Sequence, residues 1–184
     1  MELTTKDYRV ETSARHVHLS QADLITLFGV DAKLEVVKPL SVNGEFKSDK
    51  TVTILGTKRN LERVAVLGPC RTQTQVEISV SDGYTLGIQN VPVRMSGDLH
   101  GSAPVTLVGT AGQVELAEGL IVAQRHLHIN RADMQKYGLL DGQNIDIEVG
   151  ALRKTTFHNV VVRASNVDFP TVHLDTDEAN ATRD

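Results

Sequence analysis

Hydrophobic and polar residues alternate along several short stretches of the chain, and this period of two predicts β-strands. The stretches are rich in β-branched residues, and each ends close to Gly, Asn or Asp. The predicted strands are 51–55, 75–80, 105–108, 144–149 and 155–163. Typical turn signals are Asn43-Gly44, Asp82-Gly83 and Asp141-Gly142. The pattern predicts a mainly β fold, with mostly antiparallel barrels or sandwiches rather than βαβ units.

Two short helices are marked by the residues at their ends. Ser20 is a suitable N-cap for a helix that stops at Gly29, and an acidic residue lies three positions after the cap. Asn130 and Gly138 enclose a second segment of the same design. Each predicted helix directly follows a histidine-rich stretch.

An internal repeat accounts for these histidine-rich stretches. The pattern Arg-His-apolar-His-apolar occurs at 15–19 and again at 125–129, each time before a helix cap. A second similarity relates 52–57 to 105–110. The repeats predict two related subdomains, and because no Pro-rich or low-complexity linker separates them, we expect the subdomains to pack tightly.

The repeated histidines have the spacing of metal ligands. The two pairs are His16 with His18 and His126 with His128. In an extended chain, side chains two residues apart project from the same face, about 7 Å apart at Cα, which is within reach of one metal ion. The intervening Val17 and Leu127 would then face a core. The alternative is an exposed polar strand face. Because the histidine pair occurs twice with the same flanking residues, metal binding is favoured.

Two imidazoles do not complete a first-row metal site, so further ligands are expected among the remaining His, Asp and Glu residues. Glu77 lies in an alternating strand, on the face opposite its apolar neighbours. His173 lies between two apolar residues in the same way. For both residues the alternative is a polar strand position without a ligand role, and for Glu77 the sequence alone slightly favours a solvent-facing carboxylate.

Four arginines accompany the predicted ligands and suit an anionic substrate, because guanidinium groups bind phosphate and carboxylate bidentately. They are Arg15, Arg71, Arg94 and Arg125. Arg71 follows Gly68-Pro-Cys70, which we interpret as a turn that ends a short apolar strand. A surface salt bridge is the alternative for Arg71. The glycine-rich phosphate loops Gly-x-Gly-x-x-Gly and Gly-x-x-x-x-Gly-Lys-Ser/Thr are absent from the sequence.

Composition excludes several other classes of protein. A net charge of −4 and a pI near 6.0 argue against a nucleic-acid-binding surface. Cys70 is the only cysteine, which excludes an intramolecular disulfide and indicates a reducing compartment. It is expected to pack as a small residue rather than act as a nucleophile. No apolar run approaches the roughly 18 residues of a membrane span, and residues 1–10 lack a signal-peptide centre, so we expect a cytoplasmic protein without a membrane partner.

Several motifs together resemble the PduL-type phosphotransacylases, also called phosphate propanoyltransferases. They occupy 13–20, 68–71 with 74–77, 92–98, 125–128 and 173–180. The resemblance extends from about residue 10 to residue 180. It implies reversible exchange of a short acyl group, acetyl or propanoyl, between coenzyme A and inorganic phosphate at a two-metal site, usually with zinc.

The resemblance also assigns residues to roles. It implies that one metal is held by His16, His18 and Glu77, and the other by His126, His128 and His173. Arg71 matches the phosphate-binding arginine, and the predicted contacts to coenzyme A are Ser13, Lys38, Leu67, His173 and Asn180. Two departures are Ala65, where family members can carry Arg, and Cys70, where Ala is more usual. The alternatives are a metal-dependent thioester or phosphoester hydrolase and a metal-binding scaffold without activity.

For the architecture, the resemblance implies two β-barrel subdomains with short capping helices. The first would combine 5–14 with 123–184, the second would span 15–122, and the active site would lie at their interface. Family members in bacterial microcompartments often carry an N-terminal amphipathic targeting helix. Residues 1–12 show no helical apolar stripe, so we expect a free enzyme. The expected oligomer is a homodimer.

Overall fold

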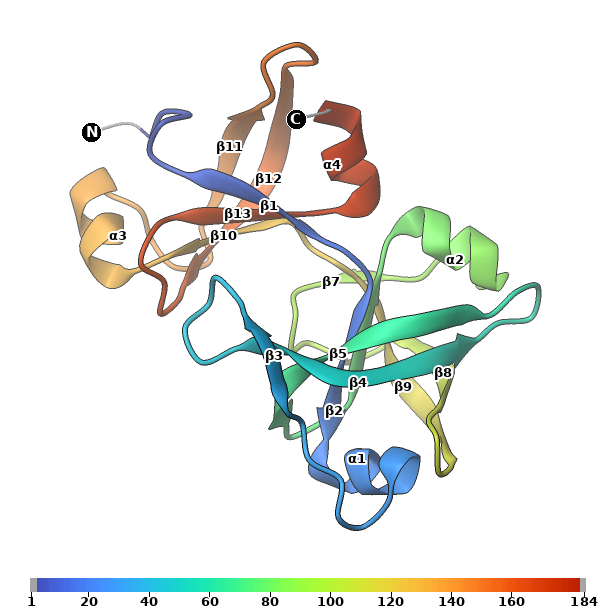
Figure 1. Ribbon diagram of the computed structural model, residues 1–184. Helices are drawn as coiled ribbons and strands as arrows, with labels where there is room; N and C mark the ends of the chain where they lie inside the picture. Colours follow the sequence, from blue (N-terminus) through green and yellow to red (C-terminus); the bar gives the residue numbers. More distant parts are fainter. Residues whose placement is uncertain (1–2, 183–184) are drawn as a thin grey trace. The chain divides into compact units, whose positions relative to one another are not determined.

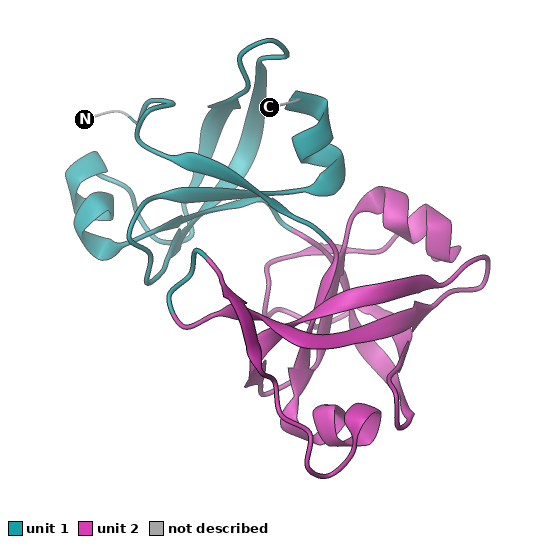
Figure 2. Ribbon diagram, in the orientation of Figure 1, with its two compact units in different colours: residues 1–14, 41–43, 124–184 teal, residues 15–40, 44–123 magenta. Residues whose placement is uncertain are grey.

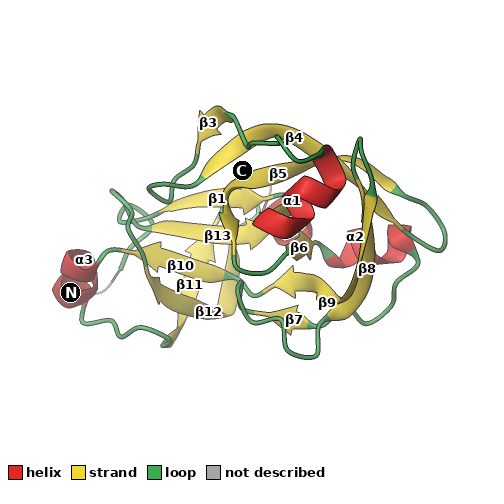
Figure 3. Cartoon of the chain, turned by 90° about the horizontal axis from the view of Figure 1, so that it is seen from below, coloured by secondary structure: helices red, strands yellow, loops and turns green. Residues whose placement is uncertain are grey.

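The computed structural model describes residues 3–182, which fall into two compact units (Figure 2). Unit 1 comprises 1–14, 41–43 and 124–184, and unit 2 comprises 15–40 and 44–123. Both units consist mainly of strands, with a few short helices (Figure 3). The predicted mainly β fold is therefore confirmed. In the described part of the chain, no helix has the length and apolarity to cross a membrane.

Unit 1 contains a five-stranded sheet in the order β1-β13-β10-β12-β11 (Figure 1). Its strands are β1 (Arg9–Ser13), β10 (His126–Ile129), β11 (Asn144–Val149), β12 (Thr155–Ala164) and β13 (Thr171–Asp175). Its helices are α3 (Arg131–Tyr137) and α4 (Thr176–Thr182). The central strand β10 pairs antiparallel with β13 and parallel with β12, so both of its edges are hydrogen-bonded.

Unit 2 contains an eight-stranded sheet, in which β2 has the corresponding central place between β5 and β6. Its strands are β2 (His16–Ser20), β3 (Val36–Pro39), β4 (Phe46–Leu55), β5 (Leu61–Arg71), β6 (Gln75–Ile78), β7 (Val93–Arg94), β8 (Ala103–Val108) and β9 (Gln113–Ala123). Its helices are α1 (Gln21–Phe28) and α2 (Val80–Leu86).

The strand pairings of unit 2 form a ring. Strand β8 pairs with both β4 and β9, so the ladder runs through β4, β5, β2, β6, β9 and β8. In unit 1, the described strands follow a linear path from β1 to β11. Two sheets with short helices are thus established, and the division into two barrels stays a prediction.

The apolar residues between the repeated histidines face the cores, as predicted. Val17 and Leu127 are both 0% exposed and belong to the cores of unit 2 and unit 1 respectively. Burying such a side chain stabilises the fold by about 1.5–3 kcal/mol. The alternation therefore fixes which face of each strand carries the histidines.

The predicted helices are also confirmed. Ser20 caps α1 by accepting a hydrogen bond from the backbone N–H of Asp23, and Asn130 caps α3 by accepting one from Asp133. Gly138 ends α3 in the left-handed conformation at φ 68°, which glycine adopts without steric cost.

One predicted strand is too long and one predicted turn is wrong. The strand predicted at 75–80 ends at Ile78, and α2 begins at Val80, whose side chain is 49% exposed. Ser79 and Asp82 form a capping box, which favours a helix start over a continued strand. The Asp82-Gly83 turn signal therefore lies inside α2.

A second turn is also wrong. The segment at 68–70 was expected to end a strand, but β5 continues through it to Arg71. Phe46 covers this part of the strand so closely that a Cβ on Gly68 would meet its ring at 2.2 Å. The absence of a side chain at this position allows the strand to pass beneath the ring.

The expectation of mostly antiparallel sheets is confirmed for seven of the twelve ladders between the described strands, and the other five are parallel. Parallel ladders join β1 to β13, β10 to β12, β2 to β5, and β9 to both β6 and β7. The sheets are mixed because each central strand has one parallel neighbour.

The second sequence similarity does not relate the two units. Its copies, 52–57 and 105–110, both lie in unit 2, where Thr53 pairs with Val108 and Leu55 with Thr106. The similarity therefore reflects two antiparallel neighbours in one sheet. The Arg-His-x-His repeat has one copy in each unit.

Candidate active site

In unit 2, the predicted ligands meet on two neighbouring strands. His16 of β2 lies directly opposite Glu77 of β6 in the antiparallel ladder. The rings of His16 and His18 are 5.0 Å apart between centroids, and one ligand atom from each of the three residues lies within 4.8 Å of the others. All three side chains are buried, so the solvent-facing alternative for Glu77 is wrong.

Unit 1 repeats this arrangement with a third histidine in place of the carboxylate. His126 of β10 lies opposite His173 of β13. Ligand atoms from His126, His128 and His173 also lie within 4.8 Å of one another. We call His126, His128 and His173 the unit 1 triad, and His16, His18 and Glu77 the unit 2 triad.

The correspondence between the triads extends beyond the sequence repeat. In both units a helix N-cap follows the third ligand by two residues, and an acidic residue follows it by five. The caps are Ser79 and Asp175, and the acidic residues are Asp82 and Glu178. The cap and the acidic residue lie outside the Arg-His-x-His motif. The fold therefore shows that the repeat includes a second strand, the one that carries Glu77 or His173, and the helix that follows it.

The arginine of each motif binds the acidic residue of its own unit. Arg15 donates from Nε to Asp82 at 3.0 Å, and its Nη2 lies 2.7 Å from the other carboxylate oxygen. Arg125 Nη1 lies 3.0 Å from a Glu178 oxygen. Each arginine therefore joins the His-x-His strand to the helix that follows the third ligand. That these two arginines bind an anionic substrate stays a prediction.

Hydrogen bonds orient the unit 1 histidines. His126 Nδ1 donates to the Gln124 carbonyl at 2.8 Å, because a carbonyl can only accept. His128 Nδ1 lies 2.6 Å from the Ser165 hydroxyl, which lies 3.2 Å from the Arg163 carbonyl. The Nδ1 atom of each ring thus has a fixed partner, and the two Nε2 atoms are directed toward each other.

This orientation suits a cation. The two Nε2 atoms lie 2.9 Å apart, close enough for one ion to bind both. Hydrogen bonds at Nδ1 are the usual means of orienting ligating histidines. Three imidazoles, or two imidazoles and one carboxylate, are donor sets that hold zinc and related divalent ions, so both triads fit such an ion.

The charge state of Glu77 also fits a cation site. Burial alone would raise the pKa of this carboxyl, but the nearby His16 and His18 and a hydrogen bond from Ser96 hold the pKa well below its usual range. His16 Nε2 lies 3.5 Å from a Glu77 oxygen. Glu77 is therefore a carboxylate, the form that ligates metals.

His173 has further polar neighbours in unit 1. Its Nε2 lies 3.5 Å from a Glu11 carboxylate oxygen and 3.4 Å from the Ser41 hydroxyl. The hydrogen bond with His173 lowers the pKa of Glu11 to about 2, against the effect of partial burial. Glu11, which sequence reasoning did not single out, thus adds negative charge beside the unit 1 triad.

Arg71 reaches the polar side chains near the unit 2 triad. Its Nη1 donates to the Ser96 hydroxyl at 3.0 Å, and its Nη2 donates to a Glu45 oxygen at 3.2 Å. The guanidinium is partly exposed, so solvent and a dissolved anion can reach it. A phosphate would compete with Glu45 for the same donor.

The residues predicted to bind coenzyme A are divided between the units. Ser13, His173 and Asn180 belong to unit 1, and Lys38 and Leu67 belong to unit 2. In unit 2, one cross-strand row runs from Lys38 through Lys47 and Leu67 to His18. Lysine residues and a predicted metal ligand thus occur along one row of the sheet.

In unit 1, Ser13 pairs with Asp175 at the end of β1, and Asn180 lies in α4 with an exposed side chain. Ala65, where family members can carry Arg, lies opposite His16. Arg94, another arginine noted in the sequence, bonds the backbone carbonyls of Val93 and His100. Arg94 therefore supports its own loop.

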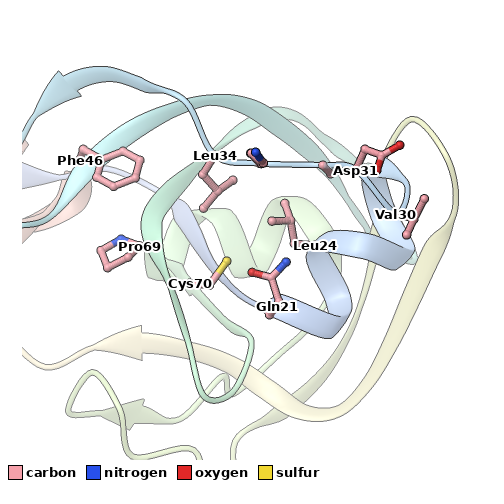
Figure 4. A pocket seen from close by; sticks show the side chains of 10 residues that line it. Gln21, Leu24, Val30, Asp31, Leu34, Phe46, Pro69 and Cys70 are labelled. Carbon is pink, nitrogen blue, oxygen red and sulfur yellow. The ribbon is translucent and has the colours of Figure 1, made fainter.

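A pocket of about 760 Å³ lies elsewhere in unit 2, beside α1 and strands β4 and β5 (Figure 4). Figure 4 shows Phe46 and Pro69 at one end, Val30 and Asp31 at the other, and the Cys70 sulfur between them. Burial raises the pKa of the Cys70 thiol, which agrees with a packed rather than reactive cysteine. None of the predicted metal ligands is among the described residues that line this pocket.

Sequence reasoning missed the residues that support the triads. Ser165, Ser96 and Gln75 are common residue types in strands and loops, and no spacing rule relates them to the histidines. Ser96 lies in the 92–98 motif and Gln75 in the 74–77 motif, so the resemblance marked the segments without giving them a role.

The fold and the triads indicate the class of protein: a mainly β protein with two donor groups of the kind that hold divalent metals. The chain belongs to the phosphate propanoyltransferase family, whose model matches residues 9–183. The predicted resemblance is thereby confirmed.

Relatives in several bacteria cover nearly all of the chain. A phosphate propanoyltransferase of Rhodobacter capsulatus is 45% identical over 172 residues, which span 94% of this chain and 80% of the relative. Those of Clostridioides difficile and Rhodopseudomonas palustris are 44% and 43% identical over 94% of this chain and 82% and 76% of the relatives. Family membership supports phosphate acyltransferase activity.

Proposed function

We propose that the protein exchanges a short acyl group, acetyl or propanoyl, between coenzyme A and inorganic phosphate. The family match over residues 9–183 carries this proposal, because that range includes all of the predicted metal ligands and Arg71. In the forward direction a phosphate oxygen attacks the thioester carbonyl, a C–O bond forms, the C–S bond breaks, and the thiolate leaves as coenzyme A.

Each triad is proposed to hold one divalent ion, with zinc the expected metal. In unit 2 the ligands would be His16, His18 and Glu77, and in unit 1 they would be His126, His128 and His173. When bound, such an ion supplies Lewis acidity, which stabilises a thiolate or a phosphate oxygen. Both triads are proposed to be needed for the one reaction.

Arg71 is proposed to bind the attacking phosphate. Its planar guanidinium can donate two parallel hydrogen bonds to a phosphate dianion. In doing so it would give up its hydrogen bond to Glu45. Holding phosphate in a fixed orientation lowers the entropic barrier of a reaction between two dissolved molecules. Because Cys70 is packed and its pKa is raised, direct attack by phosphate is favoured over an acyl-enzyme intermediate.

Coenzyme A is proposed to contact Ser13, Lys38, Leu67, His173 and Asn180. The row that leads from Lys38 and Lys47 to Leu67 and His18 supports this assignment within unit 2, because amines suit the phosphates of the cofactor while His18 belongs to the metal site.

An exchange assay with the purified chain tests the proposal. Propanoyl-CoA is incubated with and without inorganic phosphate, while free thiol and acyl phosphate, trapped with hydroxylamine, are measured. We expect equal amounts of both products, formed only with phosphate, lost after treatment with a chelator and restored by Zn²⁺. Thiol release without phosphate would indicate a hydrolase, and bound zinc without turnover would indicate a scaffold.

A further inference from the structure

A buried glutamine occupies β6 two residues before the proposed ligand Glu77. Gln75 is 1% exposed and lies opposite His18 in the ladder with β2. A buried amide that lacks hydrogen bonds would cost about 1–3 kcal/mol, so its partners explain why it is tolerated in the interior.

The amide of Gln75 connects two parts of unit 2. Its Nε2 donates to a Glu77 carboxylate oxygen and, at 2.9 Å, to the Ser96 hydroxyl. Its Oε1 accepts from the backbone N–H of Gly97 at 2.7 Å. Gln75 therefore attaches the 95–97 loop to the strand that carries the metal ligand.

The Ser96 hydroxyl completes the connection. Its oxygen accepts from Gln75 at 2.9 Å and from Arg71 Nη1 at 3.0 Å, which uses both acceptor sites of a serine hydroxyl. The guanidinium of Arg71 is thus joined through Ser96 and Gln75 to the carboxylate of Glu77.

We propose that Gln75 and Ser96 are positioning residues that hold the metal ligand Glu77 and the phosphate-binding Arg71 in one fixed geometry. The inference rests on the proposed function and adds a role for the 92–98 motif. Removing either group frees both the carboxylate and the guanidinium to take other rotamers, so metal binding and phosphate use decline together.

Unit 1 supplies a natural control. Thr171 precedes His173 by two residues and pairs with His128, which is the ladder position that Gln75 has in unit 2. Its hydroxyl donates to the Phe169 carbonyl and accepts from Arg9. Thr171→Val thus removes a buried polar group from the equivalent strand position without touching the network around Ser96.

The test measures zinc retention and phosphate use in the full-length chain. Four variants are equilibrated with increasing concentrations of a chelator, and zinc per chain is determined by mass spectrometry. The variants are Ser96→Ala, Ser96→Thr, Gln75→Leu and Thr171→Val. For Ser96→Ala and Gln75→Leu we expect one zinc equivalent to be lost at 10- to 100-fold lower chelator concentration, as for other groups that support metal ligands, with the second equivalent unchanged.

The kinetic readout is the KM for phosphate, which we expect to rise about 5- to 10-fold in Ser96→Ala, the change that corresponds to one lost hydrogen bond. Ser96→Thr, which keeps the hydroxyl, should restore both properties. Thr171→Val should leave the unit 2 zinc equivalent and the KM for phosphate unchanged. If Gln75→Leu fails to fold, Ser96→Ala in the loop still tests the positioning role.

The outcomes separate this inference from the proposed function. If the wild-type chain exchanges acyl groups and holds zinc, but Ser96→Ala and Gln75→Leu match it in both readouts, the positioning role is overturned and the function stands. If the wild-type chain holds zinc without exchange, zinc retention still tests the positioning of Glu77. A wild-type chain that holds no zinc overturns both.

Discussion

The Nε2 atoms of His126 and His128 lie 2.9 Å apart, and the Nδ1 atom of each ring has a fixed hydrogen-bond partner. These partners direct both Nε2 atoms toward each other. Ligating histidines are oriented in this way, with Nδ1 held by a hydrogen bond and Nε2 directed to the metal ion.

The Ser165 hydroxyl should control metal affinity in unit 1. In Ser165→Ala, His128 loses its Nδ1 acceptor and can rotate or change tautomer, so we expect zinc affinity at the unit 1 triad to fall about 10- to 100-fold. Competition with a chelator measures the change. Thr155→Ala, which removes a hydroxyl bonded to the Arg153 carbonyl, is the control and should not alter zinc affinity.

Loss of a ligand should have a larger effect than loss of its support. His128→Ala should reduce bound zinc by one equivalent and abolish exchange, because two imidazoles hold the ion poorly. Metal analysis and the exchange assay measure both effects. His158→Ala is the matched control, since that side chain is 69% exposed and pairs with Asp146 on the surface. Near-native activity of zinc-depleted His128→Ala would remove the unit 1 triad from the reaction.

Substitutions at Arg71 and Glu45 should change the KM for phosphate in opposite directions. Arg71→Ala should raise it at least about 10-fold, and Arg71→Lys should recover only part of the loss, because a lysine cannot bind phosphate bidentately. Glu45→Gln should lower it about 5-fold, since the competing carboxylate is neutralised. Initial rates against phosphate concentration give these values. An unchanged phosphate dependence in Arg71→Ala would exclude this residue from the site.

The Arg15–Asp82 contact should stabilise unit 2. A double-mutant cycle of Arg15→Ala and Asp82→Ala is expected to give a coupling free energy of about 1 kcal/mol, because Arg15 is partly exposed while Asp82 is buried. Urea unfolding of the metal-free chain supplies the free energies. Asp133→Ala is a matched control, since Asp133 has the corresponding place in α3 and bonds Asn130. Additive effects of the Arg15 and Asp82 substitutions would refute the coupling.

Stability in acid should depend on Asp7. Hydrogen bonds from Thr4 and Tyr137 lower the pKa of Asp7 from 3.8 to about 2. A depressed carboxyl pKa stabilises the folded state above pH 3.8, and this contribution is lost as pH falls to about 2.

Asp7→Asn should therefore lower the Tm of the metal-free chain most at pH 5 and hardly at pH 2. Thermal unfolding between these pH values, measured by circular dichroism, tests the expectation. A Tm difference between variant and wild type that stays constant over the range would contradict it.

Local patterns predicted the parts of the structure that depend on near neighbours in the chain. Alternation placed Val17 and Leu127 in the cores, and cap residues located α1 and α3. The same reasoning failed at Asp82-Gly83, because a turn signal and a capping box contain the same residue types. Resemblance to a family supplied the predicted third ligand of each group, which residue patterns alone left open.

The two His-x-His strands follow from local pattern, since a period of two and an apolar residue between the histidines decide which face each imidazole takes. The residue that completes each group does not follow from local pattern. The pairing of His16 with Glu77 and of His126 with His173 depends on cross-strand register between segments far apart in the chain. The same folding buried Glu77 and placed Ser165 and Ser96 at hydrogen-bonding distance, and no local pattern encodes such contacts.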